Sequence, residues 1–161
     1  MEQPNLTQLT PIAATCACFH LRKASRAVTQ LFAENMKSSG LQVTQFTILV
    51  AVAIAGSSRI SDLAEDLVMD RTTLTRALKP LVKRGLIVVE PGRDRRIKVV
   101  SLTAKGYAVM SKAVPFWQEA QAHVVDNLGD KKWNTLLTLL ETLSENTNIL
   151  SESLSERCIY T

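Results

Sequence analysis

The 161-residue sequence has few cysteines, few aromatic residues and no long apolar run, and each absence excludes a class of protein. Three cysteines, in a chain whose start lacks the basic and then apolar pattern of a signal peptide, do not indicate a secreted disulfide framework, so we expect a cytoplasmic protein. The most apolar window, Phe46 to Ala55, is too short to span a bilayer, and we expect no membrane contact. At this length, residues 1–161 fit a single domain.

Motifs of catalysis are also missing. The chain has no phosphate-binding glycine loop, no GxSxG elbow, no HExxH motif and no paired Cys-x-x-Cys ligands. Its two histidines, His20 and His123, are far apart in the sequence. We therefore expect no enzyme, no cofactor and no metal ion; a Cys/His-dependent enzyme and a non-catalytic helical adaptor are the alternatives.

Positive charge is concentrated in one stretch. Residues 71–105 contain ten Lys and Arg against two Asp and Glu, a local net charge of +8, whereas the rest of the chain has nine basic and thirteen acidic residues, a net charge of −4. This pattern is expected of a surface that binds a polyanion through its phosphates, and a solvated basic face is the alternative.

Helical signals precede this basic stretch. A long helix is predicted from Thr10-Pro11, with Thr10 as N-cap, to about Met36, before Gly40. A second helix, capped by Thr44 with Val43 stapled onto Ile48, is apolar on all sides and should be buried until Gly56 ends it. A short third helix is predicted with Ser61 as its cap and an inward face made of Leu63, Ala64 and Leu67.

The basic stretch itself reads as a helix followed by a hairpin. Asp70 caps an amphipathic helix that ends at Gly85 and has its apolar residues at Leu74, Ala77, Leu78, Leu81 and Val82. Residues 86–90 and 96–102 then read as two strands joined by a polar turn. The predicted fold is mainly α with a small β-hairpin wing, in the order of a winged helix-turn-helix.

Two helices with a three-and-four apolar spacing follow, one capped by Thr103 and one after Gly129-Asp130. A small DNA-reading unit could not cover both apolar seams and the long first helix. We expect residues 42–103 to form the DNA-binding lobe, and residues 10–38 and 104–156 to supply dimerisation helices. An intramolecular bundle is the alternative.

The exposed face of the helix after Asp70 has side chains suited to DNA. A helical wheel places Thr72, Arg76, Lys79 and Lys83 opposite the apolar face, with Thr73 and Thr75 on its flanks. Arginine binds guanine through two hydrogen bonds, threonine meets a base edge or a thymine methyl group, and lysine neutralises phosphate. In the hairpin, Arg93, Arg95 and Arg96 suit a minor groove, and Asp94 is expected to hold one of these arginines or to serve ordinary turn chemistry.

The stretch from residue 60 to residue 106 resembles the MarR (multiple-antibiotic-resistance repressor) family of winged-helix regulators. It reads ISDLAEDLVMDRTTLTRALKPLVKRGLI, then PGRDRRIKVVSLTAKG. The wing pattern Asp94-Arg95-Arg96 and the strand end Ser101-Leu102-Thr103 carry the resemblance, and the flanking helices agree in length and order. The resemblance therefore covers nearly the whole chain.

The resemblance implies a function and its residues. It implies a triangular homodimer that binds a near-palindromic double-stranded operator as a transcriptional regulator, a repressor relieved by a small ligand or by cysteine oxidation. Thr73, Thr75 and Arg76 match the family's base-reading positions, and Asp94 and Arg96 match its wing-tip pair. One departure is Pro80, which removes an amide inside the recognition helix and should kink or loosen that turn.

The first helix holds a possible redox sensor. Cys18-Phe19-His20-Leu21 resembles the sensing segment Cys-Phe-Ala-Leu of the family's organic-hydroperoxide repressors, although position 22 is Arg22 and tyrosines are absent nearby. Cys16 is the second candidate, and Cys158 could resolve an oxidised Cys18 across a dimer. Both thiols could instead be buried small hydrophobes, and a metal site lacks enough ligands.

The family also uses small aromatic or lipophilic effectors, which bind between the dimerisation helices and the DNA-binding lobe. Phe19, Phe46 and Trp117 are the candidate lining residues, although the core is the usual place for each of them.

Overall fold

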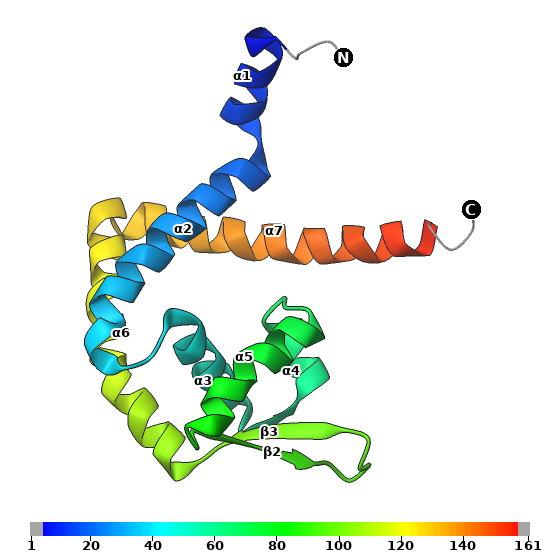
Figure 1. Ribbon diagram of the computed structural model, residues 1–161. Coiled ribbons are helices and arrows are strands. Elements are labelled where there is room, and N and C mark those ends of the chain that lie inside the picture. Colours follow the sequence, from blue (N-terminus) through cyan, green and yellow to red (C-terminus); the bar gives the residue numbers. More distant parts are fainter. Residues whose placement is uncertain (1–4, 158–161) are drawn as a thin grey trace. The chain divides into compact units, whose positions relative to one another are not determined.

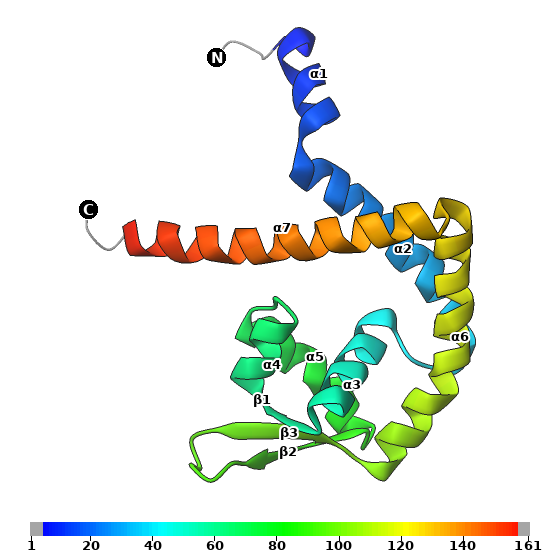
Figure 2. The same cartoon turned by 180° about the vertical axis from the view of Figure 1, so that it is seen from behind.

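The computed structural model describes the backbone of residues 5–157 and the side chains of residues 5–146 apart from Gln8 (Figures 1 and 2). In chain order, the described elements are α1 (Leu6–Thr15), α2 (Ala17–Met36), the 3-10 helix η1 (Lys37–Ser39), α3 (Val43–Ala55), β1 (Ser57–Arg59), α4 (Ile60–Asp66), α5 (Arg71–Lys83), β2 (Ile87–Pro91), β3 (Lys98–Leu102), α6 (Ala104–Leu128) and α7 (Asp130–Arg157). The chain divides into two compact units, residues 1–120 and residues 121–161. The mainly α fold with a small winged sheet is confirmed.

The sheet has three antiparallel strands in the order β1-β3-β2. Val100 lies at its centre, because it is buried and pairs with Ser58 of β1 and Val89 of β2. The hairpin of β2 and β3 was predicted. The three-residue strand β1 was not, because so short a segment has no visible alternation of apolar and polar residues.

The first helix begins earlier than predicted and is interrupted. It starts at Leu6, where the Asn5 Oδ1 accepts from the Thr7 amide at 3.3 Å, so Thr10 is not the N-cap; the Thr10 hydroxyl instead donates to the Leu6 carbonyl at 2.8 Å. Cys16, with an extended backbone (φ −68°, ψ 112°), separates α1 from α2. The predicted end at Met36 is confirmed.

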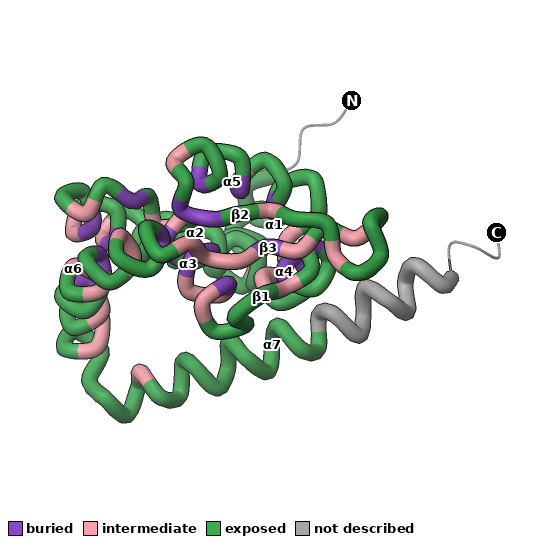
Figure 3. The backbone as a smooth tube through the Cα atoms, turned by 90° about the horizontal axis from the view of Figure 1, so that it is seen from below, coloured by how far each residue is buried: buried purple, intermediate pink, exposed green. Residues whose placement is uncertain are grey.

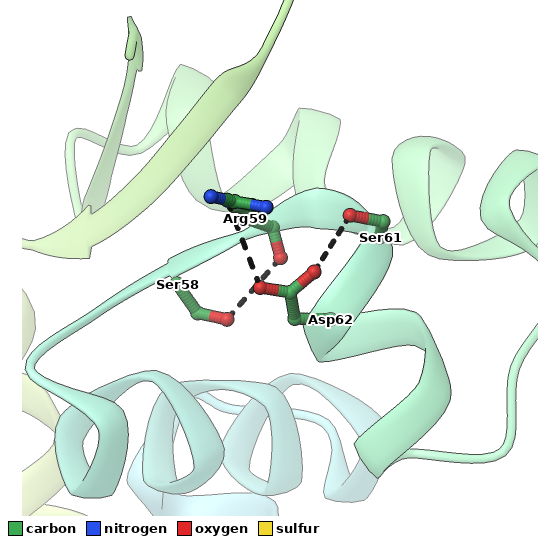
Figure 4. Close-up of polar contacts among 4 residues, drawn as sticks. All are labelled: Ser58, Arg59, Ser61 and Asp62. Atoms are coloured by element: carbon green, nitrogen blue, oxygen red, sulfur yellow. Dashed lines mark hydrogen bonds and ion pairs between the residues drawn. The ribbon is translucent and has the colours of Figure 1, made fainter. Parts of the chain in front are cut away.

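Two predicted N-caps are each wrong by two residues. The residue before α3 is Gln42, not Thr44. The Gln42 amide donates to the Gln45 Oε1 at 3.3 Å, so this amide at the N-terminus of α3 has an acceptor. The residue before α4 is Arg59, not Ser61. The Ser61 hydroxyl donates instead to Asp62 Oδ1 at 2.8 Å, and Arg59 Nε lies 3.9 Å from Asp62 Oδ2. Figure 4 shows these residues at the start of α4.

The core lies where α3, α4, α5 and the sheet meet (Figure 3). Its largest fully buried side chains are Met36, Ile48, Leu49, Val52, Leu63, Leu74, Leu81, Leu86, Ile87 and Val100. Two predicted inward positions are wrong, because Ile54 of α3 is 83 % exposed and Val82 of α5 is 44 % exposed. α3 is therefore buried on one side only, although nearly all of its residues are apolar.

The long helices α6 and α7 begin and end as the caps predicted. The Thr103 hydroxyl accepts from the Gly106 amide at 2.9 Å at the start of α6, and Gly129, with φ +76°, separates α6 from α7. Within the described side chains of α7, large apolar residues are exposed: Leu136, Leu137, Leu139, Leu140 and Leu143. The described leucines of the seam predicted for this helix, Leu136, Leu140 and Leu143, are thus exposed.

Candidate nucleic-acid interface

Helix α5 starts at a defined N-cap. The Asp70 Oδ1 accepts from the Thr73 amide at 2.9 Å, as predicted for this residue. Hydrogen bonds from the Thr73 hydroxyl and the Thr73 amide lower the pKa of the Asp70 carboxyl from its ordinary value. The carboxylate therefore fixes the first turn of α5, which holds the short polar side chains expected to meet DNA.

The two faces of α5 differ as the periodicity predicted. Leu74, Leu78 and Leu81 are buried in the core. The opposite face is exposed and consists of Thr72, Thr73, Thr75, Arg76, Lys79 and Lys83. The Thr75 hydroxyl donates to the Arg71 carbonyl at 2.7 Å, so its proton is engaged within the helix while its methyl group and lone pairs remain available.

Pro80 does not interrupt α5. The helix continues to Lys83, and the Pro80 carbonyl accepts from the Arg84 amide at 3.1 Å. The structure therefore shows no break in α5 at the turn that Pro80 was expected to kink or loosen. Lys83 stays on the exposed face, whereas Arg84 is half-buried.

The wing tip, residues 92–97, is organised by Asp94. The Asp94 Oδ1 accepts from the Arg96 amide at 2.9 Å, the Asp94 carbonyl accepts from the Ile97 amide at 2.9 Å, and the Gly92 amide donates to the Ile97 carbonyl at 2.8 Å. This carboxylate shapes the turn through the backbone, which is the second of the two roles expected of it. Arg93, Arg95 and Arg96 are all exposed.

The cations of α5 and of the wing are not neutralised by neighbouring carboxylates. Within the described side chains, the ion pair found is Arg59 with Asp62, outside both elements. A groove of about 300 Å³ links the two elements, since it is lined by Thr75, Lys79 and Lys83 of α5, by strand residues Val89 and Lys98, and by Ile60, Leu78 and Val82. One face of the first unit thus has exposed cations on a helix and on an adjacent wing, as phosphate binding requires.

Comparison with known proteins assigns this architecture to a family. Residues 39–97, which include α3, α4, α5, β2 and the wing tip and end just before β3, match the model of the MarR family. The transcriptional regulator MosR of M. tuberculosis, solved in complex with DNA, is 37 % identical, with a TM-score of 0.77 over 84 % of this chain and 98 % of that chain. The chain belongs to the MarR family.

Other MarR-like proteins agree with this assignment. The HTH-type transcriptional regulator SarZ of Staphylococcus aureus is 30 % identical over 95 residues, which are 58 % of this chain and 64 % of SarZ. The Staphylococcus epidermidis SarZ match covers 61 % of that protein, so the similarity spans less than two thirds of these curated relatives. Bordetella bronchiseptica BpsR, whose DNA binding is regulated by 6-hydroxynicotinic acid, is 26 % identical, with a TM-score of 0.73 over 80 % of this chain and 92 % of that chain.

The two described cysteines of this MarR-family chain lie at the break between α1 and α2 and just after it. Cys16 is half-buried at the break, and Cys18 is exposed on the first turn of α2, so burial as a small hydrophobe does not describe Cys18. The His20 Nε2 lies 3.0 Å from the Ala14 carbonyl oxygen, which spans the break. Cys158 lies outside the described residues.

A pocket of about 350 Å³ lies between α3 and α6, within the first unit. It is lined by Phe46, Thr47 and Val50 of α3 and by Val114 and Trp117 of α6. This pocket is therefore lined by Phe46 and Trp117, two of the three aromatic residues expected to contact an effector. Phe19 is not among its lining residues and is 51 % exposed on α2.

The described residues contain neither a cluster of metal ligands nor a single helix able to span a membrane. Among the described residues there is no group of three or more His, Cys, Asp or Glu side chains placed to hold a metal ion. In the same part of the chain no single helix is long and apolar enough to cross a membrane, and the bent pair 17–39 and 43–55 passes that test only together.

Proposed function

We propose that this MarR-family chain is a sequence-specific transcriptional regulator that binds double-stranded DNA as a homodimer and acts as a repressor in the cytoplasm. It is proposed to have no enzymatic activity. The observation that carries the proposal is the set of exposed cations on α5 and on the wing. The N-capped α5 is an α-helix, and the major groove of B-DNA is wide enough to admit one.

Each interface residue has a proposed role. Arg76, with Thr72, Thr73 and Thr75 beside it, reads base edges from the first two turns of α5. Lys79 neutralises phosphate. The exposed Arg93, Arg95 and Arg96, on a turn ordered by Asp94, enter the adjacent minor groove.

The homodimer rests on uncovered apolar surface. The exposed leucines of α7 and the exposed Leu6, Leu9 and Ile12 of α1 would leave a monomer with large apolar faces in water. A second copy that covers them would also set the spacing of two wings on a near-palindromic operator.

Small-molecule control is proposed for the pocket between α3 and α6. Its walls are mostly apolar, with one aromatic residue from each helix, and its volume of about 350 Å³ suits a small aromatic or lipophilic effector. The regulation of the similar protein BpsR by 6-hydroxynicotinic acid supports this chemical class.

Oxidative control is proposed for Cys18, with Cys16 as the second thiol. The exposed Cys18 thiolate would attack an oxygen of an organic hydroperoxide; the S–O bond forms, the O–O bond breaks, and the alcohol leaves after taking up a proton. The product is a sulfenic acid at the break between α1 and α2.

The DNA proposal is tested with the purified full chain and a duplex selected by it from a random library. Arg76→Ala should weaken binding mostly at one base position, whereas Lys79→Ala should weaken all duplexes alike and reduce the slope of log Kd against log salt by about 0.9. Binding that is independent of salt, or no duplex binding at all, would refute the proposal.

The oxidation proposal has its own test. Organic hydroperoxide should release the wild-type chain from its duplex, and Cys18→Ser should remain bound. Unchanged release from the Cys18→Ser chain would exclude Cys18 as the sensor and leave the DNA proposal intact.

A further inference from the structure

Arg84, the residue directly after α5, is the cation of the basic stretch that faces inward. It is half-buried, and its Nη1 donates to the Gln45 Oε1 of α3 at 3.2 Å, across a separation of 39 residues. Every other Lys or Arg on α5 and at the wing tip is exposed. Composition alone would count Arg84 with the phosphate-binding cations, and its contact gives it a different role.

The acceptor of this hydrogen bond is itself fixed. The Gln45 Oε1 also accepts from the Gln42 amide at 3.3 Å, at the first turn of α3. The side chain of Gln45 is therefore tied to its own helix end and is also in contact with the guanidinium group of Arg84. A bond between a charged donor and a half-buried acceptor is stronger than a neutral one in water.

The backbone of Arg84 is held from the other side by α6. The Lys105 Nζ donates to the Arg84 carbonyl at 2.8 Å, which places a cation at the negative C-terminal end of α5. One residue further, the Gly85 carbonyl accepts from the Thr103 hydroxyl at 2.8 Å. The end of α5 is thus held by α3 through a side chain and by α6 through backbone carbonyls.

From these contacts we infer that Arg84 is a positioning residue, which fixes the recognition helix against α3 and α6 and does not bind phosphate. This inference rests on the proposed DNA-binding function. Because α5 reads DNA with its first turns, a small rotation at its last residue moves Thr72 and Arg76 away from the bases. The same two helices line the pocket, so the contacts of Arg84 connect the pocket walls to the DNA-reading helix.

The test separates a positioning residue from a phosphate contact by salt dependence. For the full chain on its selected duplex, Arg84→Ala and Gln45→Ala should each weaken binding about 10-fold, and the slope of log Kd against log salt should not change. Lys83→Ala, which removes the exposed neighbour, is the matched control and should reduce the slope by about 0.9.

Two further variants make the test specific to the pair. The double variant Gln45→Ala/Arg84→Ala should bind no more weakly than either single variant, because both lose the same hydrogen bond. Gln45→Glu should retain wild-type affinity, because its carboxylate still accepts from Arg84. Thermal unfolding checks that each variant folds. If Arg84→Ala does not fold, the DNA affinities of Gln45→Ala and Gln45→Glu test the inference instead, because only the first variant should bind more weakly than the wild type.

The possible results have distinct meanings. A slope reduced by about one in Arg84→Ala, or full affinity in Gln45→Ala, would overturn the inference and leave the DNA-binding proposal standing. Failure of wild-type and Lys79→Ala chains to show any salt-dependent binding would instead refute the proposed function itself.

Discussion

Gly106, in the first turn of α6, lies directly against the backbone carbonyl of Leu86. A β-carbon at position 106 would overlap the Leu86 carbonyl oxygen and also crowd the Leu102 side chain. The first turn of α6 can therefore approach the junction of α5 and β2 only because residue 106 has no side chain. This close approach brings Thr103 and Lys105 within hydrogen-bonding distance of the end of α5.

Gly106→Ala should lower the free energy of unfolding by about 1–3 kcal/mol, because a backbone carbonyl cannot move aside as a flexible side chain would. Chemical denaturation measures this loss. The control is Ala108→Gly, at an exposed position of the same helix, which should cost about 1 kcal/mol through helix propensity alone. Since alanine is the better helix former, a more stable Gly106→Ala chain would mean that the backbone contact is not tight.

Val68 is the described non-glycine residue with a left-handed backbone, at φ +50°, in the turn between α4 and α5. A β-branched residue is strained there, and Val68 gains little from burial because its side chain is 67 % exposed.

Val68→Gly should therefore raise the free energy of unfolding by about 1 kcal/mol, after allowance for the greater flexibility of glycine in the unfolded chain. Val68→Ala removes the branching but keeps a β-carbon, so its gain should be smaller. Urea denaturation of both variants gives the comparison, and a less stable Val68→Gly chain would contradict the strain argument.

Asp70 should make the stability of the chain depend on pH. Because hydrogen bonds lower the pKa of its folded-state carboxyl from 3.8, the carboxylate stabilises the fold above that value. This stabilisation is lost as the pH falls through the lowered folded-state pKa.

The melting temperature of Asp70→Ala should lie below that of the wild type at pH 7, and the gap should narrow as the pH falls below 3.8 and through the lowered folded-state pKa of Asp70. Asp70→Asn is the control, since it keeps an N-cap acceptor but does not titrate. An equal gap for Asp70→Ala at pH 7 and at the acid end would contradict a stabilising carboxylate.

The sequence predicts those elements whose signals are local. The cap at Asp70, the spacing of Leu74, Leu78 and Leu81, and the polar turn of the wing each lie within a few residues, and the structure has α5 and the hairpin where they were expected. A helical wheel and the turn residues predicted the DNA-facing side chains, and family resemblance pointed to a subset of them; the structure has these residues exposed on α5 and at the wing tip.

The features that were not predicted depend on long-range contacts or on weak caps. The hydrogen bond from Arg84 to Gln45 joins residues 39 apart, and no local pattern marks it. The break at Cys16 was not predicted because neither glycine nor proline is next to it in the sequence. The hydroxyls of Thr44 and Ser61 are good acceptors and therefore predict caps, yet α3 and α4 begin two residues earlier than these caps predict.

Asp94 offers the sharpest test of how the wing works. Charge alone predicts that removing this carboxylate from among three exposed arginines strengthens DNA binding. The structure predicts the opposite for Asp94→Ala, because the Arg96 amide loses its acceptor at 2.9 Å and the turn that directs the arginines is no longer fixed.

Asp94→Asn separates these effects, since its amide oxygen still accepts from the Arg96 backbone while the negative charge is gone. We expect Asp94→Ala to bind the selected duplex more weakly than the wild type, and Asp94→Asn to bind it at least as tightly. Fluorescence anisotropy at two salt concentrations measures both affinities. If both variants bind more tightly, charge outweighs turn geometry; if both bind more weakly, the carboxylate has a role that its backbone hydrogen bond does not explain.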